Sequence, residues 1–454
     1  DEDDDLSFLD IDADGQLFFT YEDSPSQTSA DAVLKDLPDF PLVIADESTS
    51  LPFAPYSGGS VRFMELNAGS LEFRLVSART QDVQVRIRIP SLTRDGVVFE
   101  RTVSIVYSGS TPSEAFIEPI SVEGYRLEVV NDEIQLEYTA TSNGQVVEIE
   151  PIVGQARGWE IANVQGNFEE QQFQVKYDSI EIELFDLWSG GRLTFEEPKL
   201  VVTFENSFGF PAAGRIRNLR AITVDNQVIN FETDSPDNTF DIAYPSVAEM
   251  GSTKTTAITF VNINSIFDDI LNAQPRLLVY ELDLTLNPTD QQDVIGFVAS
   301  ESEVVTHVNV ELPVYGTASE FEIEERAEFD MGEDTDEIIE GEIKLIAENG
   351  IPINLGLQFY FTNQSDQIVD SLFSAQTLVL PAAEVDTDGN VIRTGDATTV
   401  IAVSPARMDL QRTYKDIITS AVISTSNTDN RSVRVNANQV LDIKLGARLV
   451  VDPE

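Results

Sequence analysis

Apolar and polar residues alternate along much of the chain. In residues 83–89, valine or isoleucine occupies every second position, with glutamine and arginines between them. The same period of two recurs in residues 179–184, 280–286 and 441–449. Such a period places one face of a strand in a core and the other in water, as in antiparallel sheets. The pattern therefore predicts four strands, each with one buried and one exposed face.

Turn signals separate these stretches, and helical spacing is scarce. Asp-Gly or Asn-Gly pairs, which favour hairpin turns, stand at residues 14–15, 95–96, 143–144 and 388–389. Short helices are predicted only at residues 264–273, 409–417 and 30–37. We therefore predict an all-β protein, built as elongated tandem antiparallel β-sandwich or curved-sheet domains with one or two short helices.

The chain of 454 residues is longer than one ordinary domain. Turn-rich stretches predict an acidic N-terminal hairpin and linker over residues 1–55, a first β-domain over 56–240 and a second over 241–454. The polar, proline-containing residues 233–238 are predicted to link the two β-domains.

A loose internal repeat consists of a strand, a corner and a returning strand. The strand starts as Gly-x-Leu-x-Phe at residues 69–73 and 191–195, with a looser copy at 341–345. The corners read Asn-Ser-Phe-Gly-Phe-Pro at 206–211 and Asn-Gly-Ile-Pro at 349–352. In such corners, glycine or asparagine supplies unusual backbone angles, and proline ends strand pairing.

This strand-and-corner pattern resembles the late-embryogenesis-abundant type-2 β-sandwich and the tubular lipid-binding domains. Across about residues 60–450, the mixture is similar to large surface lipoproteins of Bacteroidetes-type bacteria. The resemblance implies an extracytoplasmic protein at the outer membrane, on the cell surface, held by an N-terminal lipid anchor. The tubular domains wrap a sheet around a long helix, whereas this chain offers only the short helix at 264–273.

The net charge limits the kinds of partner. There are 79 acidic and 28 basic residues, so the formal charge is 28 − 79 = −51. Phosphates would be repelled, which excludes nucleic acid as the main partner. Only seven of the basic residues are lysine, and two interpretations stay open: a halophilic adaptation to high salt, or an ordinary solvated acidic exterior.

The chain lacks most of the residues that carry catalysis. It has no cysteine, which excludes disulfides, zinc–thiolate sites and thiol chemistry. Its single histidine, His307, is predicted to lie on the polar face of a strand with Asn309 and Glu311. No segment reaches the roughly 18 apolar residues of a spanning helix. We therefore expect that the protein is not an enzyme.

Two acidic segments near the start allow two interpretations each. Residues 1–5 resemble the acidic signal that follows a lipidated cysteine, but such charge runs are more often a solvated tail, and both interpretations stay open. Asp10, Asp12 and Asp14, followed by Gly15, match the first ligands of a calcium loop. Position 12 of that loop would be Tyr21 rather than a glutamate, so a hairpin turn is favoured and calcium is the alternative.

Aromatic and apolar residues near corners and helices are the candidate contact residues. They are either partner or lipid contacts or parts of the core. They are Trp188, Phe208, Phe210 and, on one face of the predicted helix, Ile266, Phe267 and Ile270.

The sequence thus favours a non-catalytic surface lipoprotein that acts as an interaction or scaffolding component of an outer-membrane assembly. Its expected partners are other envelope proteins or copies of itself, and the membrane through the lipid anchor. Two alternatives stay open: a lipid-binding carrier with a curved-sheet groove, and a subunit of a surface fibre joined by strand exchange.

Overall fold

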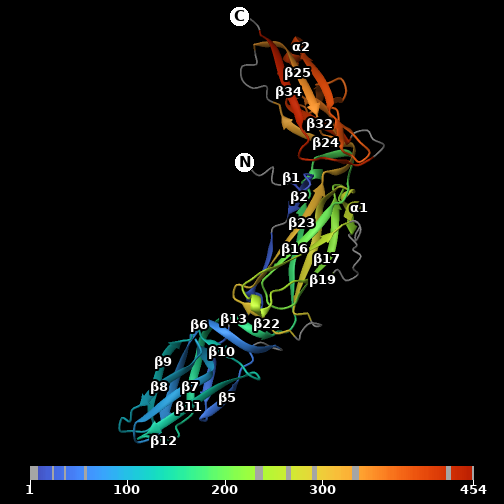
Figure 1. The fold of residues 1–454 in the computed structure, drawn as a ribbon. Helices are drawn as coiled ribbons and strands as arrows, with labels where there is room; N and C mark the ends of the chain where they lie inside the picture. The colour runs from blue at the N-terminus through green and yellow to red at the C-terminus, as the bar shows by residue number, and fades with distance from the viewer. Residues whose placement is uncertain are drawn as a thin grey trace.

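The structure is a computed structural model that describes residues 9–22, 25–34, 37–55, 59–230, 239–261, 267–288, 294–329, 337–425 and 431–451. At 174–178 and 267–268 only the backbone is described. Within these ranges all strands pair in the antiparallel sense, and the only α-helices are two short ones. The predicted all-β, elongated architecture is confirmed (Figure 1).

Three domains follow one another along a curved body (Figure 1). Residues 40–167 form the inserted domain, so called because it interrupts the central domain, which consists of residues 9–34 and 168–313. Residues 315–451 form the end domain, to which the 168–313 segment also contributes one strand.

The inserted domain is a sandwich of two four-stranded layers, ordered β4-β13-β6-β9 and β5-β11-β7-β8. β10 pairs with both β6 and β7 and so joins the layers, while β12 extends the edge beside β11. The predicted burial of Val83, Val85, Ile87 and Ile89 is confirmed. The strands are β4 (Phe40–Ile44), β5 (Ser48–Pro52), β6 (Ser60–Ser77), β7 (Val83–Arg94), β8 (Val97–Ile105), β9 (Ser113–Ser121), β10 (Arg126–Glu128), β11 (Glu133–Ser142), β12 (Gln145–Val146) and β13 (Ile152–Asn167).

The central domain packs two sheets face to face. The rings of Phe204 and Phe240, one from each sheet, lie 5.5 Å apart in the filled interior. One sheet holds β1 (Leu9–Ile11), β2 (Leu17–Glu22), β3 (Ser26–Ser29), β16 (Lys199–Asn206), β20 (Lys254–Phe260) and β23 (Glu303–Pro313). The other holds β14 (Gln171–Glu181), β17 (Ala212–Thr223), β18 (Val228–Asn230), β19 (Thr239–Ile242) and β21 (Pro275–Leu286). The predicted strand at 280–286 forms part of β21, and its apolar face is buried.

The end domain has a large sheet, a three-stranded sheet and a small hairpin. The large sheet holds β15 (Trp188–Phe195), β24 (Tyr315–Glu328), β26 (Ile353–Thr362), β27 (Ile368–Ser371), β28 (Thr377–Leu380), β32 (Asp416–Thr425) and β33 (Val433–Arg434). The three-stranded sheet holds β25 (Ile338–Asn349), β31 (Gly395–Val403) and β34 (Leu441–Val451). The small hairpin consists of β29 (Glu384–Val385) and β30 (Val391–Arg393). The alternating residues 441–449 form β34 as predicted, but the expected burial of one face is wrong, because every one of them is exposed.

The helices are shorter than predicted. α1 (Phe267–Leu271) lies inside the predicted 264–273 segment, and residues 30–32 form only a 3₁₀ turn. α2 (Pro405–Gln411) begins earlier than the predicted 409–417 helix, whose last residues belong to β32. Pro405 explains the earlier start, because proline at the first helical position needs no backbone N–H partner.

The sheets divide the chain differently from the predicted domains. The predicted boundary at residue 240 lies within the central domain, because β18 and β19 both pair with β17. The predicted linker at 233–238 lies outside the described residues. In the 1–55 segment the predicted hairpin forms as β1 and β2, but the rest supplies strands to both the central and the inserted domains.

Gly191 provides a test of how β15 is held in the end domain. It has a φ of +76°, and a Cβ there would lie 1.8 Å from the carbonyl oxygen of Glu320 in β24. At Gly190 the nearest atom to such a Cβ is the flexible Oε2 of Glu322, 3.5 Å away. We expect Gly191→Ala to lower the free energy of unfolding by about 2 kcal/mol or more, and Gly190→Ala to change it by less than about 0.5 kcal/mol. Urea unfolding measures both, and equal effects would contradict the close β15–β24 contact.

Candidate functional site

The corner at residues 206–211 closes the end of the central domain that meets the inserted domain. Phe208 and Phe210 are 0 % and 1 % exposed, and their rings lie 5.7 Å apart. The ring of Phe210 also lies 5.4 Å from that of Phe168, which directly follows β13. Of the two interpretations of these residues, the structure therefore supports a place in the core over a partner or lipid contact, because they pack against another part of the same chain.

Backbone hydrogen bonds cross this first joint. Residues 163–166 of β13 pair with residues 296–299, which form β22 (Gly296–Ala299). The N–H of Gly209 in the corner donates to the carbonyl oxygen of Phe297, at 2.9 Å. A Cβ at Gly296 would lie 2.6 Å from the carbonyl oxygen of Gly209, so the close approach requires glycine. The inserted and central domains are therefore joined by paired strands and not only by the covalent chain.

The repeated corners share one structural device, a buried asparagine. The Oδ1 of Asn206 accepts from the N–H of Phe208 at 2.9 Å, and the Oδ1 of Asn349 accepts from the N–H of Ile351 at 2.8 Å. The Nδ2 groups donate to the carbonyl oxygens of Ala243 and Ile353, respectively. Each asparagine thus satisfies backbone groups that the corner leaves unpaired.

The turn that contains the candidate calcium ligands is a hairpin turn between β1 and β2. The Oδ1 of Asp12 accepts from the N–H groups of Asp14 and Gln16, at 2.9 and 2.8 Å. The side chains of Asp10 and Asp14 are exposed to solvent. Within the described ranges, no group of three acidic or histidine residues could hold a metal ion.

The same turn forms the second joint, between the central and end domains. The N–H of Leu17 donates to the carbonyl oxygen of Val435 at 3.1 Å, and the N–H of Ala437 donates to that of Gly15 at 2.9 Å. The Nη1 of Arg434 donates to the Oε1 of Gln16 at 2.8 Å. The structure therefore gives this segment a role in holding two domains together.

Two of the other candidate contact residues belong to the core or pack against it. Trp188 is half-buried at the start of β15, where it packs against the core. Ile270 of α1 is fully buried, which supports its interpretation as part of the core over a partner or lipid contact. Ile266 lies outside the described residues, and only the backbone of Phe267 is described. None of the helices in the described part of the chain has the length and hydrophobicity to span a membrane.

His307 lies where the sequence predicts. It is half-buried in β23, on the same face as Asn309 and Glu311, and it pairs with Thr203 of β16.

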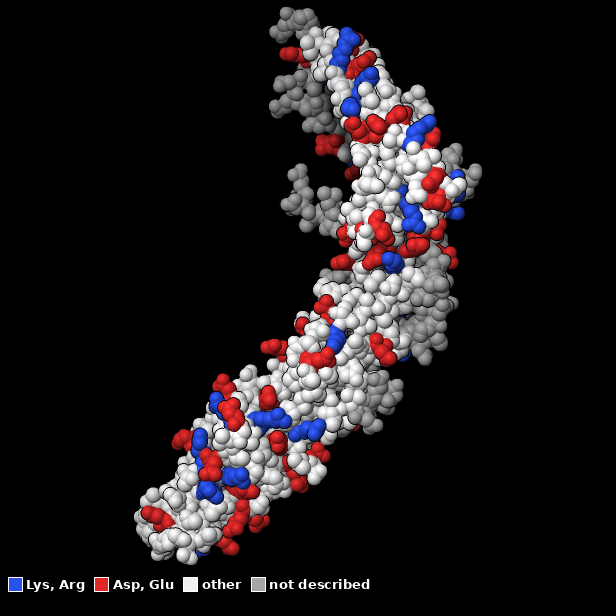
Figure 2. All heavy atoms as spheres, viewed as in Figure 1, with Lys and Arg blue, Asp and Glu red and all other residues white. Residues whose placement is uncertain are grey.

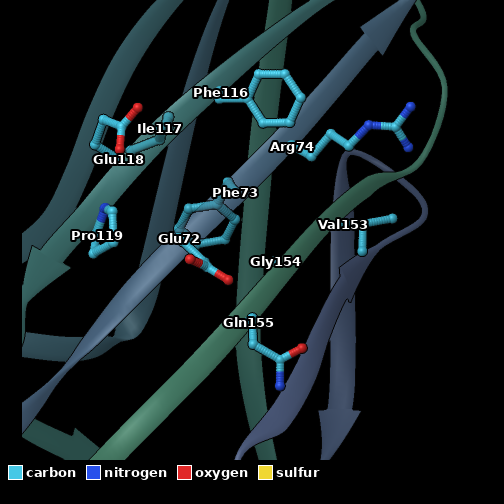
Figure 3. Close-up of a pocket in the computed structure, with 10 residues that line it drawn as sticks. All are labelled: Glu72, Phe73, Arg74, Phe116, Ile117, Glu118, Pro119, Val153, Gly154 and Gln155. Atoms are coloured by element: carbon cyan, nitrogen blue, oxygen red, sulfur yellow. The ribbon is translucent and has the colours of Figure 1, made fainter.

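An open groove on the inserted domain carries exposed apolar residues. It has a volume of about 370 Å³ and is lined from β6, β9 and β13 (Figure 3). Phe116, 61 % exposed, lies directly opposite Arg74, which in turn lies opposite Val153. We call this recess the outer groove; its lining residues are Glu72, Phe73, Arg74, Phe116, Ile117, Glu118, Pro119, Val153, Gly154 and Gln155.

Two charged groups of the outer groove, Glu72 and Arg74, are already paired. Arg74 binds Glu114, and Glu72 binds the Nε of Arg157 at 2.7 Å. Arg157 also binds Asp39, at 3.3 Å. These ion pairs fix the charged side chains, while the apolar walls stay open to solvent. Exposed apolar walls beside ordered charges resemble the surfaces that proteins use to bind one another.

A partly buried charged cluster in the end domain has a structural role. The Nε of Arg407 in α2 donates to Asp370 at 2.7 Å, and its other nitrogens donate to backbone carbonyl oxygens of Ser371 and Leu372. The hydroxyl of Tyr414 donates to the same Asp370 carboxylate. Burial alone would raise the pKa of Asp370, but the hydrogen bonds from Tyr414, Ser371 and Arg407 outweigh it and lower that pKa. The cluster fixes α2 on the sheet.

Sequence reasoning missed the outer groove, although one signal was present. In β9, Phe116 and Ile117 are adjacent, which breaks the alternation of apolar and polar residues. Adjacent side chains of a strand point to opposite faces, so one of two neighbouring apolar residues has to lie on the outer face.

Comparisons with known proteins add little to this geometry. No protein-family model matches the chain, and no curated protein matches it by sequence. A proposed secreted protein from Parabacteroides distasonis is 15 % identical, with 63 % of this chain and 88 % of that chain covered and a TM-score of 0.26. The PBSX exported protein XepA is 10 % identical, with coverage of 62 % and 88 % and a TM-score of 0.14. TM-scores of this size do not show a shared fold.

Two phenylalanine substitutions compare what the first joint and the outer groove contribute to the stability of the fold. Phe208→Ala removes a fully buried ring, and we expect it to lower the free energy of unfolding by about 3–5 kcal/mol. Phe116→Ala removes an exposed ring, and we expect a change below about 0.5 kcal/mol. Chemical denaturation of both variants measures the difference. A small effect at Phe208 would mean that the corner is not part of the core.

Proposed function

We propose that the protein is a non-catalytic interaction component of a bacterial cell envelope, in which stacked β-domains hold a binding surface away from the point of attachment. The observation that carries the proposal is the pair of hydrogen-bonded joints, at β13–β22 and between residues 15–17 and 435–437. Backbone hydrogen bonds across both joints favour one continuous elongated body over three domains on flexible linkers (Figure 1).

In this proposal the outer groove is the contact surface for another envelope protein. Val153, at the groove, and Gly166, at the first joint, are ends of the same strand β13. At about 3.3 Å per residue, this separation places the groove roughly 40 Å from the joint. The groove thus lies towards the far end of the inserted domain, where a partner could reach it.

The acidic surface suits such a role. Acidic side chains outnumber basic ones over the visible face of the body (Figure 2). A large net charge keeps a protein hydrated and opposes non-specific association, so binding depends on the few places with a different chemistry. The attachment to the outer membrane by a lipid is part of the proposal, and it is supported by the acidic run at residues 1–5 and the resemblance to surface lipoproteins.

A lipid carrier has less support from the geometry. The side chains predicted to face an acyl chain include Ile270, Phe208 and Phe210, and all three are buried in the core. Large aromatic side chains such as Phe204 fill the space between the sheets of the central domain. We therefore favour a role in protein–protein interaction.

The test measures binding of the labelled full chain to outer-membrane fragments of the bacterium that encodes it. We expect saturable binding, and we expect the double variant Arg74→Ser/Phe116→Ser to weaken it at least about tenfold, because it removes the central contact residues of the groove. The matched control is Val97→Ser/Arg101→Ser, which changes one exposed apolar residue and one exposed arginine on β8 of the other layer. Equal loss in both variants, or binding that does not saturate, would contradict the proposed contact surface.

A further inference from the structure

β34 has a long edge to which no other strand in the described part of the chain is paired. It is the outermost strand of the order β31-β25-β34 and has 11 residues. β1, β12 and β18 are also outer strands, but they have only three, two and three residues. β14 is an outer strand of the same length as β34, but it lies beside β2 and β3, as β31 lies beside β28. A long free edge presents a row of unpaired N–H and C=O groups to any strand that can reach it.

The odd-numbered residues of β34 form an exposed apolar row. Leu445, which lies opposite Leu345 of β25, is 70 % exposed. Leu345 and Ala347 on the same face of β25 are at least partly buried, so the inner face of the sheet continues uncovered onto β34. The row consists of Leu441, Ile443, Leu445, Ala447, Leu449 and Val451.

The hydrogen-bonding direction of β34 follows from one bond at its start. The N–H of Gly350 donates to the carbonyl oxygen of Val440 at 2.8 Å, in line with the β25–β34 register. In an antiparallel ladder, alternate residues bond to the same neighbour. Even-numbered residues of β34 therefore bond to β25, and the odd-numbered ones, which carry the apolar row, direct their N–H and C=O groups to the free edge.

The charges of β34 match those of a second β34 in one antiparallel register. If Leu445 lies opposite Leu445 of a second copy, Asp442 lies opposite Arg448 twice, and Lys444 lies opposite Gly446. Apolar residues then face apolar residues from Leu441 to Leu449, while Val451 lies opposite Gln439. If the two-fold axis lies at Gly446 instead of Leu445, Lys444 lies opposite Arg448. Like charges directly opposite one another are destabilising.

We infer that a second copy of this chain pairs with β34, antiparallel and about a two-fold axis at Leu445, so that two three-stranded sheets become one sheet of six strands. About ten backbone hydrogen bonds would form between the odd-numbered residues. β34 carries two basic residues and one acidic residue in a chain of charge −51, so repulsion is weak where the copies meet. Two-fold pairing uses the same edge on both copies and therefore closes as a dimer, not a fibre. The inference does not depend on the outer groove.

Cross-linking tests the register, and the chain has no cysteine to interfere. Opposite residues of a hydrogen-bonded pair are about 5.5 Å apart, so Leu445→Cys should be linked to its copy by a short bismaleimide. Leu441 of each copy lies opposite Leu449 of the other copy. The two Leu441 residues are therefore eight positions apart along the paired strands, roughly 27 Å, so two copies of Leu441→Cys should not link to each other. Mixing Leu441→Cys with Leu449→Cys should restore linking. Equal linking of the two single variants, or none at Leu445→Cys, would overturn the inference.

Charge exchange tests the pairing itself. Asp442→Arg and Arg448→Asp each create two like-charged pairs, and each should raise the dimer dissociation constant at least about tenfold at low salt. Mixing the two variants restores opposite charges across the interface and should return the dissociation constant to near that of the unaltered chain. Asp396→Arg, on the same polar face of β31, is the matched control and should have no effect.

Sedimentation equilibrium measures these dissociation constants, and thermal unfolding shows whether the variants are folded. The substituted charged residues are exposed in this structure, so we expect no loss of stability. An unaltered chain that stays monomeric at about 100 µM would overturn the inference. So would a dimer that is insensitive to both Asp442→Arg and Arg448→Asp.

Discussion

Backbone hydrogen bonding across the two joints is the constraint on which the shape of this protein depends. Val314, between β23 and β24, illustrates it: its N–H donates to the carbonyl oxygen of Leu17 at 2.7 Å, and its own carbonyl oxygen accepts from Val435 at 2.9 Å. One residue thus ties together three segments that are far apart in the sequence. Without such bonds the same sandwiches would hang on linkers, and their relative positions would be free.

The joints also explain where the unusual residues of the sequence lie. The phenylalanine and glycine corner at 206–211 closes the first joint, and the Asp-Gly turn at 14–15 leads into the second. Both segments attract attention in the sequence, because exposed aromatics suggest a binding tip and spaced aspartates suggest a metal loop. In the structure their residue types serve close backbone approach and tight turns instead.

The sequence predicts the strands well, but it predicts poorly which strand faces are buried by other parts of the protein. Alternation identifies the strands at 83–89 and 280–286 with their buried faces, because each side chain's direction follows from the period of two. The same alternation at 441–449 predicts the strand but not its exposure, since burial depends on what lies beside it. The pairing of β15 with β24, and so the true domain boundaries, joins residues about 130 positions apart, and no local pattern encodes that. The outer groove also arises from three strands, of which only the adjacent Phe116 and Ile117 left a local signal.

The distribution of charge explains why binding should concentrate at edges and grooves. The ion pairs are mainly exposed cross-strand neighbours, such as Arg88 with Glu137, and exposed pairs add little to stability. The large excess of acids therefore acts mainly on solubility and on which surfaces can approach one another. Over most of the body, two acidic surfaces repel. At the outer groove the carboxylate of Glu72 is paired with arginine, and on β34 basic residues outnumber acidic ones. Both places combine open apolar residues with basic side chains that offset part of the acidic charge, and such a combination favours specific association.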